Sequence, residues 1–256
     1  MSAQFDFTGQ TVLVTGGSSG IGLAIAQGFR DAGAAVTITG TQASIADYPD
    51  DLTTFTYHQV DMQDVPGVEA LANGISKLDV LVNNAGTTFR GEAAYDPENF
   101  EATIDINLNS VYRLSHRLVP LLKASGGSII NIASMTSYFG SPRGPGYGAS
   151  KSAILQMTMS LGALWARDGV RVNAIAPGWI ATKLTAPIQG MAEIADPILQ
   201  RTPMGRWGEP DEMIGTALFL ASSDVAGFIT GVTIPVDGGY CTLEGNALAG
   251  LRMSIG

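Results

Sequence analysis

Apolar segments typical of β-strands alternate with helical segments along nearly the whole chain. Segment 11–15 is mostly apolar, as expected for a parallel strand buried on both faces of a sheet. In segment 20–32, Ile21, Ala24 and Ile25 fall on one face, which indicates a helix packed against that sheet. Because parallel strands are joined by right-handed crossovers, the alternation predicts one doubly wound α/β domain over residues 1–256. We expect a mainly parallel seven-stranded sheet, with strands at 11–15, 35–39, 54–60, 79–82, 128–133, 170–176 and 232–236 and helices at 20–32, 65–76, 97–123, 147–167 and 211–220.

The composition narrows the possible partners. Hydrophobic residues make up 45% of the 256 residues and the mean hydropathy is +0.20, which is too apolar for a disordered chain. The net charge of −9 disfavours nucleic acid and anionic membranes. Cys241 is the only cysteine, so no intrachain disulfide is possible, and we expect no metal site because His58 and His116 are the only histidines. Without a signal-peptide pattern or a membrane-length apolar run, we expect a cytoplasmic protein.

One segment interrupts the alternation. Residues 182–206 contain three prolines and scattered apolar residues, and they follow the expected strand at 170–176. Loops after the carboxyl ends of parallel strands line the ligand crevice of such sheets. We therefore predict that residues 182–206 form a mobile lid over a substrate.

A glycine-rich turn joins the first expected strand to the first expected helix. Glycine lets a backbone turn sharply and approach a ligand closely, and a helix N-terminus offers free N–H groups to an anion. A turn of this kind that opens a βαβ unit predicts a dinucleotide site. Its candidate residues are Gly16, Ser18, Ser19, Gly20, Ile21 and Gly22.

Two further segments are expected at the same edge of the sheet. Asn83-Asn84-Ala85-Gly86 ends the fourth strand with small and amide side chains, against which a ribose or a base can pack. Asp61 follows the third strand, where its carboxylate can accept a hydrogen bond from an adenine amino group. The candidates added here are Asn83, Ala85, Gly86, Asp61 and Met62.

Tyr147 and Lys151 stand four residues apart, which places both side chains on one helix face. A phenol beside an ammonium is a candidate acid/base whose pKa is lowered by the cation. Ser134 lies at the end of the preceding strand. With the dinucleotide site, these residues suggest hydride transfer coupled to proton transfer.

In this order, the motifs resemble the short-chain dehydrogenase/reductase family over essentially the whole chain. The matching motifs are Thr15-Gly16-x-x-x-Gly20-x-Gly22, Asn83-Asn84-Ala85-Gly86, Asn107, Ser134, Tyr147-x-x-x-Lys151, Pro177-Gly178 and Asp237-Gly238-Gly239. The resemblance implies a Rossmann-like fold, an NAD(P) cofactor, a homotetramer and a reaction that interconverts a secondary alcohol and a ketone.

The resemblance also implies roles by position. Tyr147 would exchange a proton with the substrate oxygen, Ser134 would hydrogen-bond that oxygen, and Lys151 would bind the nicotinamide ribose. Asn107 would hold a water that links Lys151 to solvent. The nicotinamide end of the cofactor would contact Pro177, Gly178, Ile180 and Thr182.

The choice between NAD and NADP depends on the end of the second strand. NAD-specific relatives usually carry an acidic residue where this chain has Gly40, whereas NADP-specific relatives often carry a cation where it has Ser19 or Thr41. No Lys or Arg occurs between Arg30 and Lys77, so the residues favour NAD over NADP. Thr41, Gln42 and backbone N–H groups can nevertheless receive a phosphate.

The residues leave the substrate open. The expected pocket wall is largely apolar or aromatic, which suits a hydrophobic ketone or secondary alcohol, and consists of Met135, Tyr138, Phe139, Arg143, Trp179, Ile180 and Leu184. An alternative is a 3-oxoacyl-thioester reductase of fatty-acid type, which the C-terminal region also resembles. A third is a nucleotide-sensing protein without turnover.

Overall fold

Seven parallel strands form one sheet in the computed structural model, which describes residues 5–242. The strand order is β3-β2-β1-β4-β5-β6-β7, so the chain reverses direction across the sheet between β1 and β4. Ligands of doubly wound sheets bind at such a switch point, outside the carboxyl ends of the strands. The predicted fold class and strand number are confirmed. The strands are β1 (Thr11–Val14), β2 (Ala35–Gly40), β3 (Thr56–Gln59), β4 (Val80–Asn83), β5 (Ser128–Ile132), β6 (Arg171–Pro177) and β7 (Thr233–Val236).

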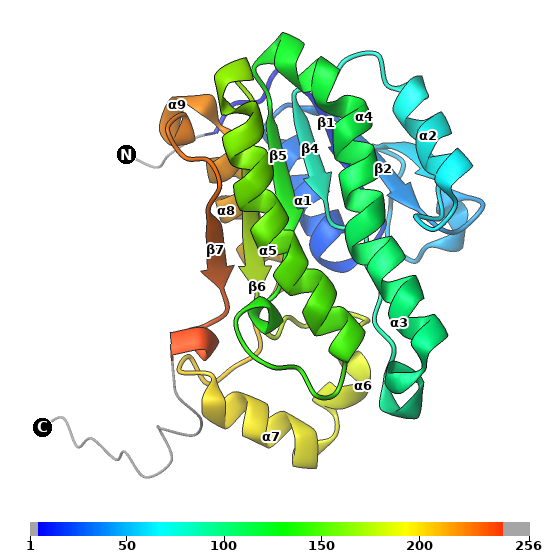
Figure 1. The fold of residues 1–256 in the computed structure, drawn as a ribbon, viewed down its shortest axis with the longest axis vertical. Helices are drawn as coiled ribbons and strands as arrows, with labels where there is room; N and C mark the ends of the chain where they lie inside the picture. The colour runs from blue at the N-terminus through cyan, green and yellow to red at the C-terminus, as the bar shows by residue number, and fades with distance from the viewer. Residues whose placement is uncertain (1–4, 243–256) are drawn as a thin grey trace, which may run out of the picture.

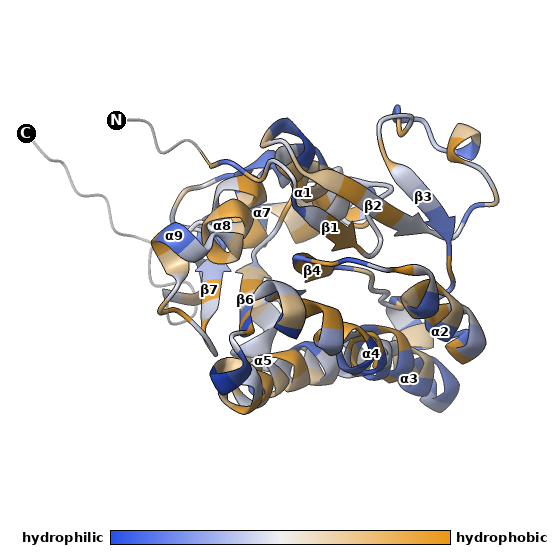
Figure 2. Cartoon of the chain, turned by 90° about the horizontal axis from the view of Figure 1, so that it is seen from above, coloured by the Kyte–Doolittle hydropathy of each residue, from blue (hydrophilic) through white to orange (hydrophobic). Residues whose placement is uncertain are grey.

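Helices cover both faces of the sheet (Figure 1; Figure 2). Alternate residues of β1 serve the two faces: Val12 and Val14 pack with α1 and α8, whereas Leu13 packs with α2, α4 and α5. All three side chains are fully buried, and burial of each contributes about 1.5–3 kcal/mol. The helices are α1 (Gly20–Asp31), α2 (Val65–Gly74), α3 (Pro97–Ile104), α4 (Ser110–Ser125), α5 (Pro145–Trp165), α6 (Ala186–Gln189), α7 (Ala192–Arg201), α8 (Ile214–Ala221) and α9 (Ser223–Ala226).

The long helix expected at 97–123 is present but is not α-helical throughout. Asp96 caps α3 by accepting a hydrogen bond from the backbone N–H of Glu98. Between α3 and α4 the chain makes a π-helical turn, Asp105–Asn109. This turn was not predicted, because π turns are set by tertiary contacts more than by residue type. Such turns occur frequently at functional sites, and this one contains the buried Asn107.

Residues 182–206 follow β6 and contain two short helices, α6 and α7. In Figure 1 both helices lie beyond the carboxyl end of β6, where the lid is expected. The movement of this segment stays a prediction. No helix within residues 5–242 is long and apolar enough to cross a membrane.

Candidate functional site

An open cleft of about 680 Å³ lies beyond the carboxyl ends of β1, β2 and β4, at the switch point of the sheet. It extends from the end of β2 to the Tyr147–Lys151 pair on α5. Its shape and position are those of a ligand site in this type of sheet. The predicted cofactor residues that line it are Gly16, Ser18, Ser19, Gly20, Ile21, Gly22, Gly40, Thr41, Asp61, Met62, Ala85, Gly86, Tyr147, Lys151 and Thr182.

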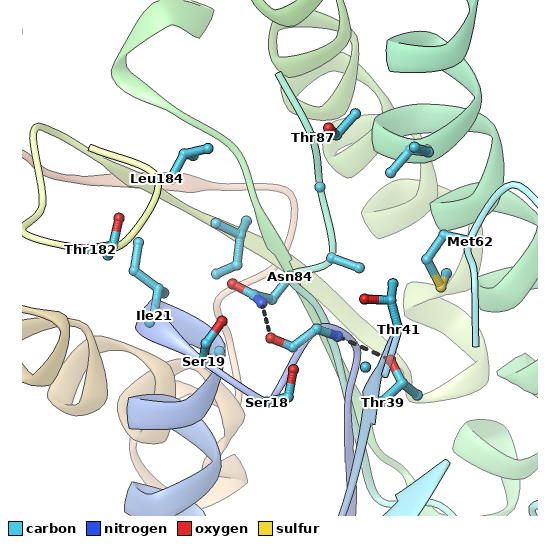
Figure 3. A pocket seen from close by; sticks show the side chains of 18 of the residues that line it. Ser18, Ser19, Ile21, Thr39, Thr41, Met62, Asn84, Thr87, Thr182 and Leu184 are labelled. Carbon is cyan, nitrogen blue, oxygen red and sulfur yellow. Dashed lines mark hydrogen bonds between the residues drawn. The ribbon is translucent and has the colours of Figure 1, made fainter. Parts of the chain in front are cut away.

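The glycine-rich turn is held tightly against the end of β4. Gly16 has a φ of +62°, and a Cβ there would lie 2.9 Å from the Cα of Ala85. The Asn84 amide donates to the Gly16 carbonyl at 3.0 Å (Figure 3). Ser19 precedes α1 without a side-chain cap, so the first N–H groups of the helix are open to an anion. The backbone cradle thus fits the pyrophosphate of a dinucleotide.

Asn83 does not line the cleft, although its motif does. Its side chain is 3% exposed and donates to Ser115 and to Asn131. Asn84 lines the cleft instead. Side chains alternate between the two faces of β4, so Asn83 lies on the same face as Leu81, which packs towards α4. This alternation is the sequence signal that could have distinguished the buried Asn83 from Asn84 in the cleft.

Three other predicted cofactor positions also lie outside the cleft lining: Pro177, Gly178 and Ile180. Gly178 packs against the chain after β7, where an added Cβ would lie 2.6 Å from the Cα of Asp237. Ile180 is 4% exposed and, with Trp179, lines a separate small cavity. The segment after β6 therefore reaches the cleft through Thr182, Lys183 and Leu184.

Tyr147 and Lys151 come together on α5 as the spacing predicts. The Lys151 Nζ lies 5.8 Å from the centroid of the Tyr147 ring. Burial raises the pKa of the Tyr147 phenol, and the Ser134 hydroxyl opposes this by hydrogen bonding to it. The expectation of a lowered phenol pKa is therefore wrong for the protein without cofactor. Protonated at neutral pH, the phenol is ready to act as an acid.

Burial is the main cause of that difference. The Lys151 ammonium is also engaged elsewhere. It donates to the Ile132 carbonyl at 2.6 Å, so one of its hydrogen bonds is directed to β5 and not to the phenol. Burial also lowers the pKa of Lys151 to about 8. The group is thus a buried cation in the floor of the cleft, close to losing its proton under mildly alkaline conditions.

Asn107 fixes the loop after β4 to α5. Its side chain accepts from the Thr87 N–H at 2.8 Å and donates to the Thr87 carbonyl at 2.9 Å and to the Ser150 hydroxyl at 3.1 Å. These bonds use both N–H groups of the amide, whereas its oxygen keeps a second lone pair. The water relay through Asn107 stays a prediction. Asn107 acts here as a clamp, because Thr87 lines the cleft.

Replacing Asn107 by alanine is expected to lower the free energy of unfolding by about 2 kcal/mol, because buried partners on Thr87 and Ser150 lose their hydrogen bonds. The KM for the cofactor should rise as the loop loosens. Urea unfolding and steady-state kinetics measure the two effects. Asn109→Ala is the matched control, since the side chain of Asn109 bonds, within the described residues, only to the Asp105 side chain on the same turn. Equal destabilisation by the two variants would contradict the clamp.

The expected substrate wall is only partly assembled around the cleft. Leu184 lines it, whereas Trp179 packs edge-on against Trp207 in the neighbouring small cavity. Phe139 packs against Tyr240 and against the guanidinium of Arg201. Tyr138 and Arg143 are exposed. Within residues 5–242 no group of three or more His, Cys, Asp or Glu side chains is arranged to hold a metal ion. The C-terminal tail beyond residue 242 lies outside the described residues.

Known proteins resemble this chain closely in sequence and fold. A family model described as Enoyl-(Acyl carrier protein) reductase matches residues 15–241. A 2-dehydro-3-deoxy-D-gluconate 5-dehydrogenase of Pseudoalteromonas atlantica is 40% identical, over 94% of this chain and 99% of its own length. A 3alpha-hydroxysteroid dehydrogenase of Mediterraneibacter gnavus is 36% identical, over 90% and 96% respectively. The crystal structure of a putative NAD(P)-dependent gluconate 5-dehydrogenase from Beutenbergia cavernae, with bound NADP, matches with a TM-score of 0.84 and 37% identity, covering 94% of this chain and 100% of its own.

Proposed function

Since the chain belongs to the short-chain dehydrogenase/reductase family, whose members interconvert secondary alcohols and ketones with NAD(P), we propose that its substrate is a polyhydroxylated sugar acid. The joining of Tyr147 and Lys151 to the nucleotide cradle in one cleft carries the hydride-transfer chemistry, and relatives named for sugar acids favour this substrate class. A cationic side chain in the cleft lining supports a carboxylate substrate. Lys183 lines the cleft, and the Arg90 guanidinium donates to the Leu184 carbonyl of the predicted lid.

The residues divide the chemistry between them. The nicotinamide cofactor supplies or accepts the hydride. Tyr147 gives a proton to the substrate oxygen in reduction and takes it in oxidation, while Ser134 hydrogen-bonds the same oxygen. Lys151 binds the nicotinamide ribose, and Asn107 holds the Thr87 loop in place. Burial, which raises the pKa of the Tyr147 phenol, keeps it protonated at neutral pH, the form that reduction requires.

NAD is the proposed cofactor, in preference to NADP. A ribose phosphate brings a charge of about −2, which binding sites usually meet with Arg or Lys. Arg30 is the last cation before Lys77, and its guanidinium already pairs with Asp31 and bonds to Thr54. Bound NADP in the Beutenbergia protein is a property of that protein.

One assay panel tests the substrate and the cofactor together. Gluconate and 2-dehydro-3-deoxygluconate are each offered with both cofactors, beside a steroid alcohol, simple ketones and an acetoacetyl thioester. We expect turnover of at least one sugar acid, with higher kcat/KM for NAD. Turnover of the thioester alone would instead establish the fatty-acid-type reductase. A variant with Arg90→Gln should raise the KM for a sugar acid but not for a neutral alcohol.

The proposed assembly is a cytoplasmic homotetramer. Large apolar side chains are exposed on α4 and α5, where Tyr112 and Leu164 are 48% and 65% exposed. Phe228, close to β7 in sequence, is fully exposed. Exposed large apolar side chains gathered on one surface are usual where subunits meet. Light scattering at micromolar concentration should give four times the mass of 26.6 kDa.

A further inference from the structure

Tyr48 occupies the space where an acidic side chain at the end of β2 would extend. Gly40 ends β2, and a Cβ built on it would lie 2.2 Å from the Tyr48 Oη and 2.8 Å from the Ser18 Oγ. A carboxylate attached at this position would therefore collide with the phenol. The chain lacks the acidic residue that NAD-specific relatives carry there, and another polar oxygen takes its place.

The phenol of Tyr48 is held in this position from several sides. A 3-10 turn, Ile45–Asp47, precedes Tyr48 and is closed by a capping box between Ser44 and Asp47. The Oη atom of Tyr48 accepts a hydrogen bond from the backbone N–H of Gln42 at 3.0 Å. The ring of Tyr57 on β3 packs edge-on against it, with the two hydroxyls 3.3 Å apart. The loop between β2 and β3 is thus folded back to deliver one hydroxyl to the end of β2.

The same hydroxyl stands beside the cofactor cleft. Ser18, Gly40 and Thr41 all line the cleft, and the side chains of Ser18 and Thr41 are seen there in Figure 3. Burial raises the pKa of Tyr48, but hydrogen bonds from Ser18, Tyr57 and the Gln42 backbone outweigh it, so that the pKa is lowered. The oxygen is therefore a strong hydrogen-bond partner at the end of the cleft where an adenosine ribose would lie.

We propose that the Tyr48 hydroxyl binds the 2′-hydroxyl of the adenosine ribose and thereby selects NAD over NADP. This inference rests on the proposed nucleotide-dependent function. A ribose hydroxyl both donates and accepts, so it pairs with a phenol in either direction. A 2′-phosphate only accepts and is far larger. The phosphate would meet a cluster of hydroxyl groups, and no Lys or Arg of residues 31–76 would neutralise it. The Asp47 carboxylate in the adjoining turn would repel it.

Direct binding measurements with chosen nucleotides test the proposal. Dissociation constants for NADH, NADPH and 2′-deoxy-NADH are taken from nicotinamide fluorescence, with the unmodified protein and with Tyr48→Phe. The unmodified protein should bind 2′-deoxy-NADH about threefold to tenfold more weakly than NADH. Tyr48→Phe should weaken NADH binding by the same factor, bind 2′-deoxy-NADH like the unmodified protein, and leave NADPH binding unchanged.

Tyr57→Phe is the matched control. It removes the other hydroxyl of the pair, which donates to the Gln42 carbonyl, and keeps the ring that packs edge-on against Tyr48. It should retain the full difference between NADH and 2′-deoxy-NADH. If the unmodified protein binds both nucleotides equally, or if Tyr48→Phe still distinguishes them, the proposal is overturned while the nucleotide-dependent function stands. Absence of binding by all three nucleotides would overturn the proposed function itself.

Discussion

Replacing Tyr147 by phenylalanine is expected to reduce kcat about 10²- to 10⁴-fold, the usual contribution of a positioned acid/base. The substitution removes one oxygen from a half-buried side chain of α5 and keeps the ring. The Lys151 ammonium keeps its bond to the Ile132 carbonyl, so the cofactor site should stay intact. Progress of the reaction is followed at the nicotinamide absorbance with the best substrate from the panel.

The cofactor provides the control for this variant. Because Tyr147 acts on the substrate oxygen, Tyr147→Phe should bind NADH within about threefold of the unmodified protein, by the same fluorescence titration. Ser137→Ala is a matched neutral change, since Ser137 lies on the adjoining turn and its hydroxyl, among the described residues, donates only to the Lys151 carbonyl. Turnover by Tyr147→Phe within tenfold of the unmodified rate would exclude the phenol as the proton donor.

At pH 7 the Lys151→Met variant is expected to be more stable than the unmodified protein, and at least about 10²-fold less active. Lys151 is 4% exposed, and burial lowers its pKa from 10.5 to about 8. This shift corresponds to roughly 3 kcal/mol of destabilisation of the folded state below pH 8. Loss of the bond to the Ile132 carbonyl offsets roughly 1–2 kcal/mol of the gain. Activity falls because the nicotinamide ribose loses the ammonium that binds it, and a small displacement of the reacting nicotinamide lowers the rate strongly.

The pH dependence has a definite sign. Below pH 8 both folded and unfolded chains hold the proton, so the burial penalty is fully present. Between pH 8 and 10.5 the unfolded chain binds more protons, and the stability of the unmodified protein rises with pH. The advantage of Lys151→Met should therefore shrink between pH 7 and 9.5 in urea unfolding. Lys123→Met, at an exposed ion pair with Asp168, should show no such trend. A constant difference across this range would contradict the buried ammonium.

The fold could be predicted because its main determinants are local or periodic. Apolar runs such as the one around Leu13 indicate a strand buried on both faces of a sheet. Their alternation with helical segments is compatible with only a few sheet topologies. The ends of elements were less accurate. The third strand was expected at 54–60 and is Thr56–Gln59, because exposed edge residues carry little apolar signal.

The site, like the fold, could be predicted where it depends on residues close together in the sequence. A cleft with a nucleotide cradle and an acid/base pair was predicted from glycines 16, 20 and 22 and from the Tyr147–Lys151 spacing, because turn geometry and helix period depend on neighbouring residues. Contacts between residues far apart in the sequence could not be predicted in this way. They direct the Asn83 side chain into the core, form the π turn that buries Asn107, and bring Tyr48 over Gly40.

The sequence by itself determined the doubly wound fold, the position of the cleft and the class of reaction, because each follows from patterns within single elements or their order. Only the tertiary structure decided the protonation of the Tyr147–Lys151 pair and the identity of the group at the end of β2. Burial sets the pKa values of Tyr147 and Lys151, and it depends on every element packed around them. Tyr48 reaches Gly40 only because the loop between β2 and β3 folds back on itself.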